Sequence, residues 1–278
     1  MTDDLLHHFR AARRYVEKWA HYLPVYERLL SKYRGTAVTL VEVGVGGGGS
    51  LEAWRGYLGP AARIIGIDLD PAAQRLEADG FEIIVGNQSH PEFWAQHGGR
   101  IGPVDVLIDD GGHSSVDQIV TVACGLPHMR DGGVIVIEDT HTSYMQLHYP
   151  SAARYGFMQF AAHVVDVLHA RNPMVTEPIA DSAGLGQAIH SVEFVESLVI
   201  FHIDRRRCGP AALFEAGVPA PAPAHEPNKT WRAAVTEVFE SMPVWARTLF
   251  RPIRRGLGSA ERAAARQVRA RRVQRYFR

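Results

Sequence analysis

Short apolar runs alternate with amphipathic segments through the middle of the chain. Five runs have the length and the β-branched content of buried strands, and they span residues 39–43, 63–67, 81–85, 104–108 and 133–137. Helical patterns follow at residues 51–57, 71–78 and 115–126. Strands that alternate with helices predict an α/β fold with a doubly wound, mostly parallel sheet and right-handed crossovers.

Flanking segments complete the predicted architecture. Residues 3–33 carry apolar and aromatic side chains at spacings near three and four, which predicts two amphipathic helices, broken at Pro24, that form an N-terminal helical cap. Residues 144–155 are expected to form a loop over the site, and residues 156–170 a helix. Residues 188–203 predict two strands around a tight turn, an antiparallel hairpin that brings the sheet to seven strands.

Composition divides the chain further. We expect a helical cap over residues 1–35, an α/β domain over 36–208, a Pro/Ala-rich linker over 209–228 and a basic, helical C-terminal extension over 229–278. The formal net charge is +0, yet residues 251–278 hold ten arginines and one acid. Such a tail can bind a polyanion or a membrane surface, although a solvated helix or a subunit contact is the simpler interpretation.

Composition also limits what kind of protein the chain can be. With 278 residues, 46% of them hydrophobic, the chain can bury a sizeable core. Two cysteines offer neither a disulfide framework nor zinc spacing, and the N-terminus does not resemble a signal peptide. We therefore expect a cytoplasmic protein with no transmembrane segment and no nucleic-acid partner. A homo-oligomer, most simply a dimer, is also expected.

The first apolar run passes directly into a glycine-rich loop at residues 44–50. Glycines let the backbone approach a ligand closely, and the helix start supplies unpaired N–H groups. Asp68 follows Gly44 by 24 residues, the interval at which a carboxylate can bind ribose hydroxyls. The loop predicts a nucleotide-type ligand held by Gly44, Gly46, Ser50 and Asp68.

Two classes of enzyme share such a loop. Gly44, Gly46 and Gly49 also satisfy the dinucleotide pattern, so an NAD(P)-dependent oxidoreductase stays open. Glu42 stands two residues before the first glycine, where it suits a cationic amino-acid ligand better than a pyrophosphate. Glu42 therefore favours a ligand that carries an amino-acid group.

Acids and histidines follow the fourth and fifth apolar runs. The fourth run ends in Asp109, Asp110 and His113, and the fifth in Glu138-Asp139-Thr-His141. The carboxyl ends of strands are where ligands bind in open α/β sheets. We expect these side chains to share one crevice.

These motifs resemble a known family. Glu42-Val-Gly-Val-Gly-Gly-Gly, Asp68, the Asn87-Gln88 pair and the acids of the fourth run are similar to the motif series of class I S-adenosylmethionine-dependent methyltransferases. Ile108-Asp-Asp-Gly-Gly-His113 and Ile137-Glu-Asp-Thr-His-Thr-Ser-Tyr144 resemble, more narrowly, the metal-dependent sugar O-methyltransferases of the mycinamicin and macrocin type. The resemblance covers about residues 38–204 and implies a Rossmann-like methyltransferase fold, with residues 36–208 as the methyltransferase domain.

The resemblance implies roles for the acids and histidines. Asp110, Glu138 and Asp139 would bind Mg²⁺, His113 would be the general base, and His141 would be a second base or a substrate contact. Crowded carboxylates call for a neutralising cation, and an all-oxygen set without cysteine suits a hard ion. The metal would lower the pKa of a sugar hydroxyl and orient it for attack on the methyl group.

The resemblance also implies how the cofactor is bound. Asp68 would bind the ribose of S-adenosylmethionine, and Asn87 and Gln88 the adenine. Asp109 would either cap the next helix or contact the methionine end of the cofactor. The predicted function is methyl transfer to a sugar hydroxyl of a glycosylated natural product, an oligosaccharide, or a polysaccharide such as methylmannose polysaccharide. An NAD(P)-dependent oxidoreductase and a non-enzymatic polyanion-binding protein are the alternatives.

Overall fold

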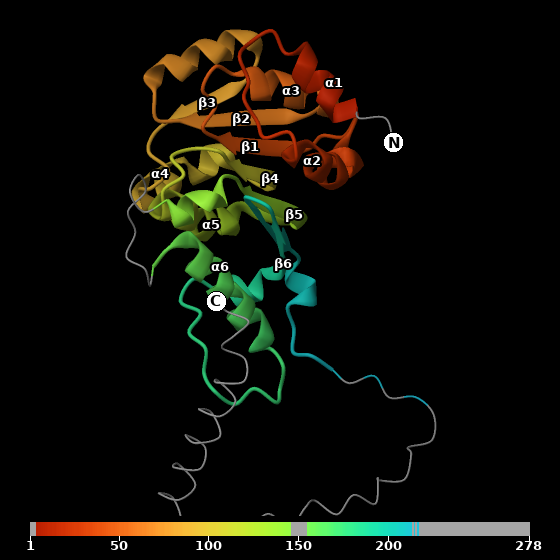
Figure 1. Cartoon of the computed structure of the whole chain (residues 1–278), viewed down its shortest axis with the longest axis vertical. Coiled ribbons are helices and arrows are strands. Elements are labelled where there is room, and N and C mark those ends of the chain that lie inside the picture. The colour runs from red at the N-terminus through yellow and green to blue at the C-terminus, as the bar shows by residue number, and fades with distance from the viewer. Residues whose placement is uncertain (1–3, 146–154, 213, 215, 217–278) are drawn as a thin grey trace, which may run out of the picture. The chain divides into compact units, whose positions relative to one another are not determined.

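The computed structural model describes residues 4–145, 155–212, 214 and 216 (Figure 1). The chain divides into two compact units, residues 1–213 and 214–278, and the elements described below lie in the first. Most of the predicted loop over the site, most of the predicted linker and the whole basic extension lie outside the described residues. The division into four regions therefore stays a prediction.

Seven strands form one sheet, in the order β3-β2-β1-β4-β5-β7-β6. All neighbouring pairs from β3 to β5 are parallel, and β7 is antiparallel to both β5 and β6. The predicted sheet and its hairpin edge are thereby confirmed. The strands are β1 Thr39–Val43, β2 Arg63–Asp68, β3 Glu82–Val85, β4 Val104–Asp109, β5 Met129–Ile137, β6 Ile189–Val195 and β7 Leu198–Ile203.

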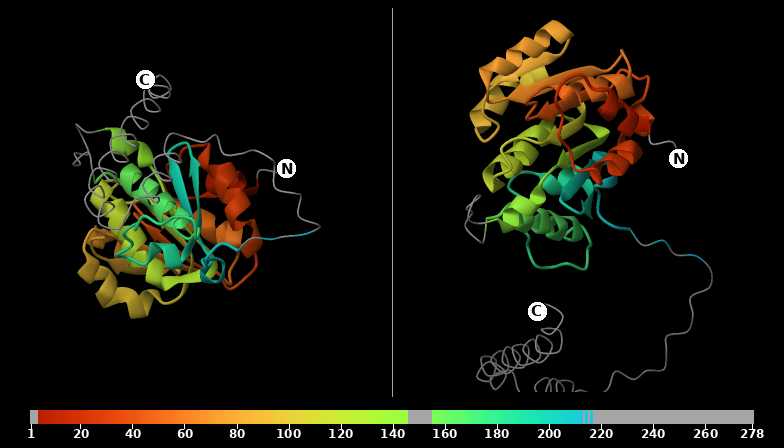
Figure 2. Two further views of the ribbon diagram at one scale, coloured as in Figure 1. Left: turned by 90° about the horizontal axis from the view of Figure 1, so that it is seen from below. Right: turned by 45° about the horizontal axis from the view of Figure 1, so that its top comes forward.

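Two helical layers cover the two faces of the sheet (Figures 1 and 2). On one face, helices α1, α2 and α3 pack against alternate strand residues such as Leu40 and Ile108. On the other, α4, α5 and α6 pack against the intervening residues such as Val41 and Leu107. Because both faces are covered, the central strands are apolar along most of their length. The helices are α1 Asp4–Ala11, α2 Tyr22–Leu30, α3 Gly49–Leu58, α4 Pro91–Ile101, α5 Ser115–Gly125 and α6 Phe157–His169.

Three elements differ from the prediction. Helix α4 was not predicted, because two adjacent glycines obscure its apolar pattern, although Pro91 occupies a favourable first helical position after His90. The segment expected to be an α-helix at residues 71–78 is the 3₁₀ helix η2, Pro71–Asp79. Strand β5 begins four residues earlier than expected, where its register with β4 shifts.

The N-terminal cap also differs in detail. Pro24 does not separate its two helices, because it lies in the first turn of α2, where proline is tolerated. The chain leaves the helical conformation earlier, between α1 and α2, in residues 12–21, which we call the N-terminal strap. This strap contributes directly to the site. Within the described residues, no helix is long and apolar enough to cross a bilayer.

Candidate active site

The glycine-rich loop joins β1 to α3 at the carboxyl edge of the sheet. Gly44, Gly46 and Gly48 have φ angles of 80°, 47° and 90°, which favour glycine. A Cβ atom on Gly44 would lie 2.1 Å from the carbonyl oxygen of Asp110. Gly44 therefore lets the loop approach the end of β4 closely.

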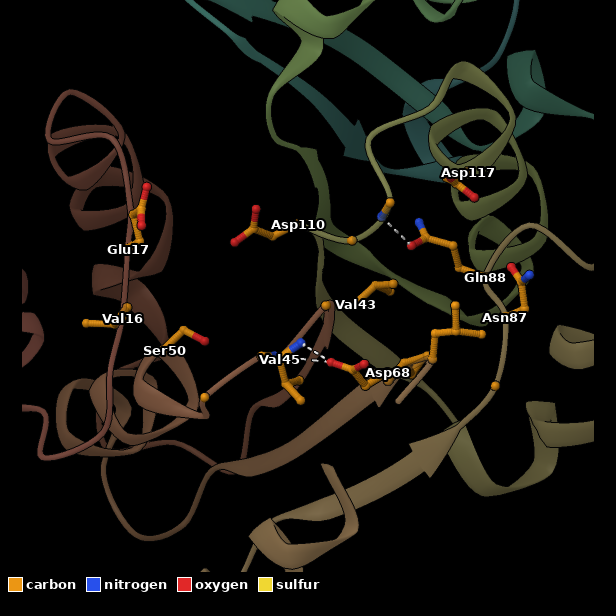
Figure 3. A pocket seen from close by; sticks show the side chains of 18 of the residues that line it. Val16, Glu17, Val43, Val45, Ser50, Asp68, Asn87, Gln88, Asp110 and Asp117 are labelled. Atoms are coloured by element: carbon orange, nitrogen blue, oxygen red, sulfur yellow. Dashed lines mark hydrogen bonds between the residues drawn. The ribbon is translucent and has the colours of Figure 1, made fainter. Parts of the chain in front are cut away.

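A cavity of about 540 Å³ lies beside this loop (Figure 3). Its lining includes six residues predicted to bind a cofactor, namely Gly44, Gly46, Ser50, Asp68, Asn87 and Gln88. Figure 3 shows Val16 and Glu17 of the strap on the opposite side from Asn87 and Gln88, with Asp110 between them. The strap therefore forms one wall of the pocket.

Asp68 fixes the shape of the glycine loop. Its Oδ2 atom accepts hydrogen bonds from the backbone N–H groups of Val45, at 2.9 Å, and Gly46, at 3.1 Å (Figure 3). Its Oδ1 atom accepts one from the N–H of Asp70. The carboxylate lines the pocket while it fastens β2 to the loop, and its predicted contact with ribose stays a prediction.

Asp109 does not occupy the place expected for it. It is 1% exposed, is not among the residues that line the cavity, and accepts a hydrogen bond from Gln88 Nε2 at 2.9 Å. Burial raises the pKa of the Asp109 carboxyl, and the hydrogen bond from Gln88 opposes that shift. Helix α5 is capped by Ser114 and Asp117 in a reciprocal capping box. Asp109 is therefore not the cap of α5, and its contact with the cofactor stays a prediction.

Gln88 lies at the pocket, but its amide is engaged within the protein. Nε2 donates to Asp109 and to Thr121, and Oε1 accepts from the N–H of Gly112 at 3.0 Å. A Cβ on Gly111 would lie 1.9 Å from the same Oε1 atom. Gln88 thus shapes the turn after β4 and explains the glycine at position 111. The contact of Asn87 and Gln88 with adenine stays a prediction.

Glu42 lies beneath the pocket rather than in its lining. It is fully buried, and its Oε2 atom accepts a hydrogen bond from Ser50 Oγ at 2.6 Å. Burial raises the pKa of Glu42, and nearby Lys18 opposes the shift. Ser50 does line the cavity, so its hydroxyl group links Glu42 to the pocket.

Three predicted residues come together beside the cavity. Asp110, His113 and Asp139 each offer one ligand atom, and these atoms lie within 4.8 Å of one another. His113 Nε2 is 3.6 Å from Asp139 Oδ2, and His141 Nδ1 is 3.9 Å from Asp139 Oδ1. We call Asp110, His113 and Asp139 the acid-histidine cluster.

The backbone at this cluster is strained. His113 and Asp139 have φ angles of 55° and 54°, a region that non-glycine residues rarely adopt. Such conformations persist where the surrounding structure fixes them, often at functional sites. Asp139 is held by Trp19 Nε1, at 3.1 Å, and by the hydroxyl of Tyr22, at 2.8 Å. The strap and α2 therefore orient the cluster.

Glu138, the remaining predicted metal ligand, is not part of this cluster but shares the ammonium group of Lys18 with Asp110. It is 2% exposed, and its Oε1 atom accepts hydrogen bonds from Lys18 Nζ, at 2.6 Å, and Tyr26 Oη, at 2.5 Å. Burial raises the pKa of the Glu138 carboxyl, and the Lys18 ammonium group opposes that shift. The grouping predicted for the three acids is thus only partly observed.

Lys18 is the central residue that sequence analysis missed. Its Nζ atom lies 2.6 Å from Glu138, 2.8 Å from Asp110 and 3.5 Å from Glu42, and its side chain is 2% exposed. Burial alone would lower the pKa of Lys18, but the three carboxylates outweigh this effect and raise it. The strap therefore delivers a buried cation to the end of the sheet.

Comparisons with known proteins agree with this architecture. No family model matches the chain. It is 33% identical over 171 residues to the 8-demethyl-8-alpha-L-rhamnosyl tetracenomycin-C 2'-O-methyltransferase of Streptomyces olivaceus, a match that covers 57% of this chain and 44% of the relative. It is 36% identical over 132 residues to the mycinamicin VI 2''-O-methyltransferase of Micromonospora griseorubida, which covers 44% of this chain and 32% of the relative. The matched part thus spans less than half the length of these relatives.

A solved structure shows the same fold. The MycE methyltransferase from the mycinamycin biosynthetic pathway, in complex with Mg and SAH, superposes with a TM-score of 0.65 at 23% identity, over 87% of this chain and 60% of that one. Together with the sequence matches, this superposition confirms the predicted resemblance and the predicted fold. Over about half of its length the chain is similar in sequence to sugar O-methyltransferases, and it has a Rossmann-like methyltransferase fold.

Proposed function

We propose that the chain transfers a methyl group from S-adenosylmethionine to a hydroxyl group of a glycosylated natural product, with the help of a divalent cation such as Mg²⁺. One observation carries the proposal: Asp110 both lines the pocket beside the glycine loop and belongs to the acid-histidine cluster. A methyl donor in the pocket and a hydroxyl at the cluster would therefore be neighbours. Transfer needs this proximity.

The pocket has suitable properties for the cofactor. A volume of about 540 Å³ falls in the range of small-molecule sites. Gly44 and Gly46 have no side chains, so a ligand can approach the backbone of the loop closely. Asp68 and Asn87 provide polar groups in the lining of the pocket. The sequence relatives, all O-methyltransferases by name, support this assignment over the oxidoreductase alternative.

The cluster has suitable properties for the metal. Asp110 and Asp139 supply the carboxylates, and Mg²⁺ in proteins commonly binds one or two carboxylates and several waters. His113 Nδ1 is buried without a hydrogen-bond partner among the described residues, so the imidazole is not committed to a structural bond there. The donor set therefore fits a divalent ion with positions left for a substrate.

The residues at the cluster have different roles in the proposed methyl transfer. When bound, the metal would increase the acidity of the acceptor hydroxyl. His113 would accept the proton of that hydroxyl, because a positioned imidazole is the commonest general base. Its ring lies in the cluster, with Nε2 3.6 Å from Asp139 Oδ2. Tyr22 and Trp19 hold the Asp139 carboxylate in place.

The acceptor would lie on the open side of the cluster. Trp19 is 55% exposed although its indole N–H is bound to Asp139, and its ring lies edge-on to His141 with centroids 6.3 Å apart. An aromatic ring with a polar contact suits the apolar faces and hydroxyl groups of a sugar. The relatives are named for glycosylated natural products, so we favour such an acceptor over methylmannose polysaccharide. The homodimer stays a prediction.

Calorimetric titration tests the cofactor class, and a transfer assay tests the reaction. We expect S-adenosylmethionine and S-adenosylhomocysteine to bind and NAD not to bind. With Mg²⁺, radiolabelled methyl groups should appear on glycosylated polyketides and not on their aglycones, and EDTA should stop the transfer. Binding of NAD alone, or equal labelling of aglycones, would contradict the proposal.

A further inference from the structure

The N-terminal strap packs against the glycine-rich loop. A Cβ atom on Gly49 would lie 2.5 Å from the carbonyl oxygen of Tyr15, and a Cβ atom on Gly47 would lie 2.9 Å from the same oxygen. A side chain at either position would therefore push the strap away from the loop. Gly47 and Gly49 make room for the strap, and residues 15–17 of the strap line the cofactor pocket.

Glu52 of α3 holds the strap in this place. Its Oε2 atom accepts hydrogen bonds from the backbone N–H groups of Arg13, at 2.8 Å, and Arg14, at 3.1 Å. Burial alone would raise the pKa of Glu52, but the hydrogen bonds from Arg14 and Arg13 outweigh this effect and lower it. The backbone of the strap is thus fixed just before the residues that line the pocket.

Glu17 lies at one end of the pocket. Figure 3 shows Asp110 between Glu17 on one side and Asn87 and Gln88 on the other. Adenine is expected at Asn87 and Gln88, and methyl transfer to an acceptor at the acid-histidine cluster requires the sulfonium group to lie near Asp110. The methionine part of the cofactor, which is attached to the same sulfur atom, then extends past Asp110 toward Glu17.

Glu17 differs from the other three carboxylates in the lining of the pocket. Asp68 and Asp117 accept hydrogen bonds from backbone N–H groups, and Asp110 is paired with Lys18. Glu17 is exposed, and its hydrogen bond comes from a neighbouring tyrosine hydroxyl. Among the lining carboxylates of the described residues, it is therefore the one bonded to neither a cation nor an N–H group.

Glu42, which the sequence suggested for a cationic amino-acid ligand, is not available for this contact. It does not line the pocket, and its oxygens are engaged by Ser50, at 2.6 Å, and Lys18, at 3.5 Å. A carboxylate that is free to bind an ammonium group is thus supplied by the strap rather than by β1.

We propose that Glu17 binds the α-ammonium group of S-adenosylmethionine. This inference rests on the proposed function for the identity of the cofactor. A carboxylate and an ammonium group form a charge-assisted hydrogen bond, which at a solvent-exposed position contributes a modest amount to affinity. The N-terminal cap then binds the cofactor directly, through a residue that lies before the methyltransferase domain in the sequence.

A double-mutant cycle on protein and ligand tests this contact. Glu17→Gln keeps the size of the side chain and removes its charge. Calorimetry measures the affinity of the full chain for S-adenosylhomocysteine and for an analogue in which hydrogen replaces the α-amino group. We expect Glu17→Gln to weaken S-adenosylhomocysteine about fivefold and to change the affinity for the analogue less than about twofold. Glu17→Lys should weaken S-adenosylhomocysteine further, because it places a like charge beside the ammonium group.

A matched control separates this contact from a general effect of charge. Glu77→Gln removes one acid from η2, outside the lining of the pocket, and should leave both affinities unchanged. Thermal unfolding checks that each variant is folded.

Three results would overturn the proposal. They are an unchanged affinity of Glu17→Gln for S-adenosylhomocysteine, an equal loss for both ligands, which would indicate a displaced strap, and an equal loss in Glu77→Gln. Any of these with a wild-type protein that binds S-adenosylhomocysteine leaves the proposed function standing, whereas a wild-type protein that does not bind it would contradict both.

Discussion

The cofactor pocket and the acid-histidine cluster adjoin each other but are built in different ways. The pocket is largely a property of the backbone: Gly44 and Gly46 adopt positive φ angles, and Asp68 fixes the loop through N–H groups. The cluster depends on side chains from the strap, α2 and the two strand ends, held by Trp19, Tyr22 and Lys18. We therefore expect the cluster to fail through single side-chain changes that leave the pocket intact.

Asp110→Asn should have the largest effect, because Asp110 belongs to both regions. We expect kcat/KM to fall about 10³- to 10⁴-fold through loss of a metal ligand. Affinity for S-adenosylhomocysteine should change little, since Asp110 is only one of many lining residues. Steady-state kinetics and calorimetry on the same preparation check both statements, and equal losses of the two quantities would show that the regions are not separable.

Lys18→Met should have the largest effect on stability. It leaves Glu42 and Glu138 buried without their cation, and removal of one partner from a buried ion pair costs about 3–5 kcal/mol. Urea unfolding at pH 7 measures this loss. Lys18→Met/Glu138→Gln should recover a large part of it, and a single variant as stable as the wild type would contradict the role given to Lys18.

His113→Ala should reduce turnover while the protein keeps its cofactor. Removal of a general base lowers kcat by about 10²-fold or more. The pH dependence of kcat should lose the limb that reports the base, which is a result that a purely structural role would not produce. An unaltered pH profile would remove His113 from this role.

Asp68→Asn should have the smallest of these effects and should act on the pocket alone. The amide oxygen can still accept the hydrogen bonds from Val45 and Gly46, but the NH2 group then replaces the acceptor of the Asp70 N–H, and the side chain lacks the charge that strengthens bonds to ribose hydroxyls. We expect affinity for S-adenosylhomocysteine to fall about tenfold, with Mn²⁺ affinity unchanged. Calorimetry that showed the reverse pattern would contradict the separation of the two regions.

The same contrast explains what the sequence could predict. The strands, the hairpin and the glycine loop depend on local patterns, so their positions followed from apolar runs and glycines. The strand ends also located Asp110, His113 and Asp139, because parallel strands bring their carboxyl ends to one edge.

The partners of these residues could not be predicted. Lys18 precedes Glu42 by 24 residues and Glu138 by 120, and no periodicity relates them. Asp109 and Gln88 have the residue types of ligand contacts, yet they bind each other in the interior. A carboxylate at a strand end is exposed or buried according to which way its side chain points, and that direction depends on the turn that follows.

Manganese anomalous diffraction tests the central claim most directly, in crystals of the full chain grown with S-adenosylhomocysteine. The cofactor is expected beside the glycine loop, with one anomalous peak at the acid-histidine cluster, beside Asp110 and Asp139. A cofactor with no peak beside it, or a peak away from Asp110 and Asp139, would contradict the assignment of the metal site.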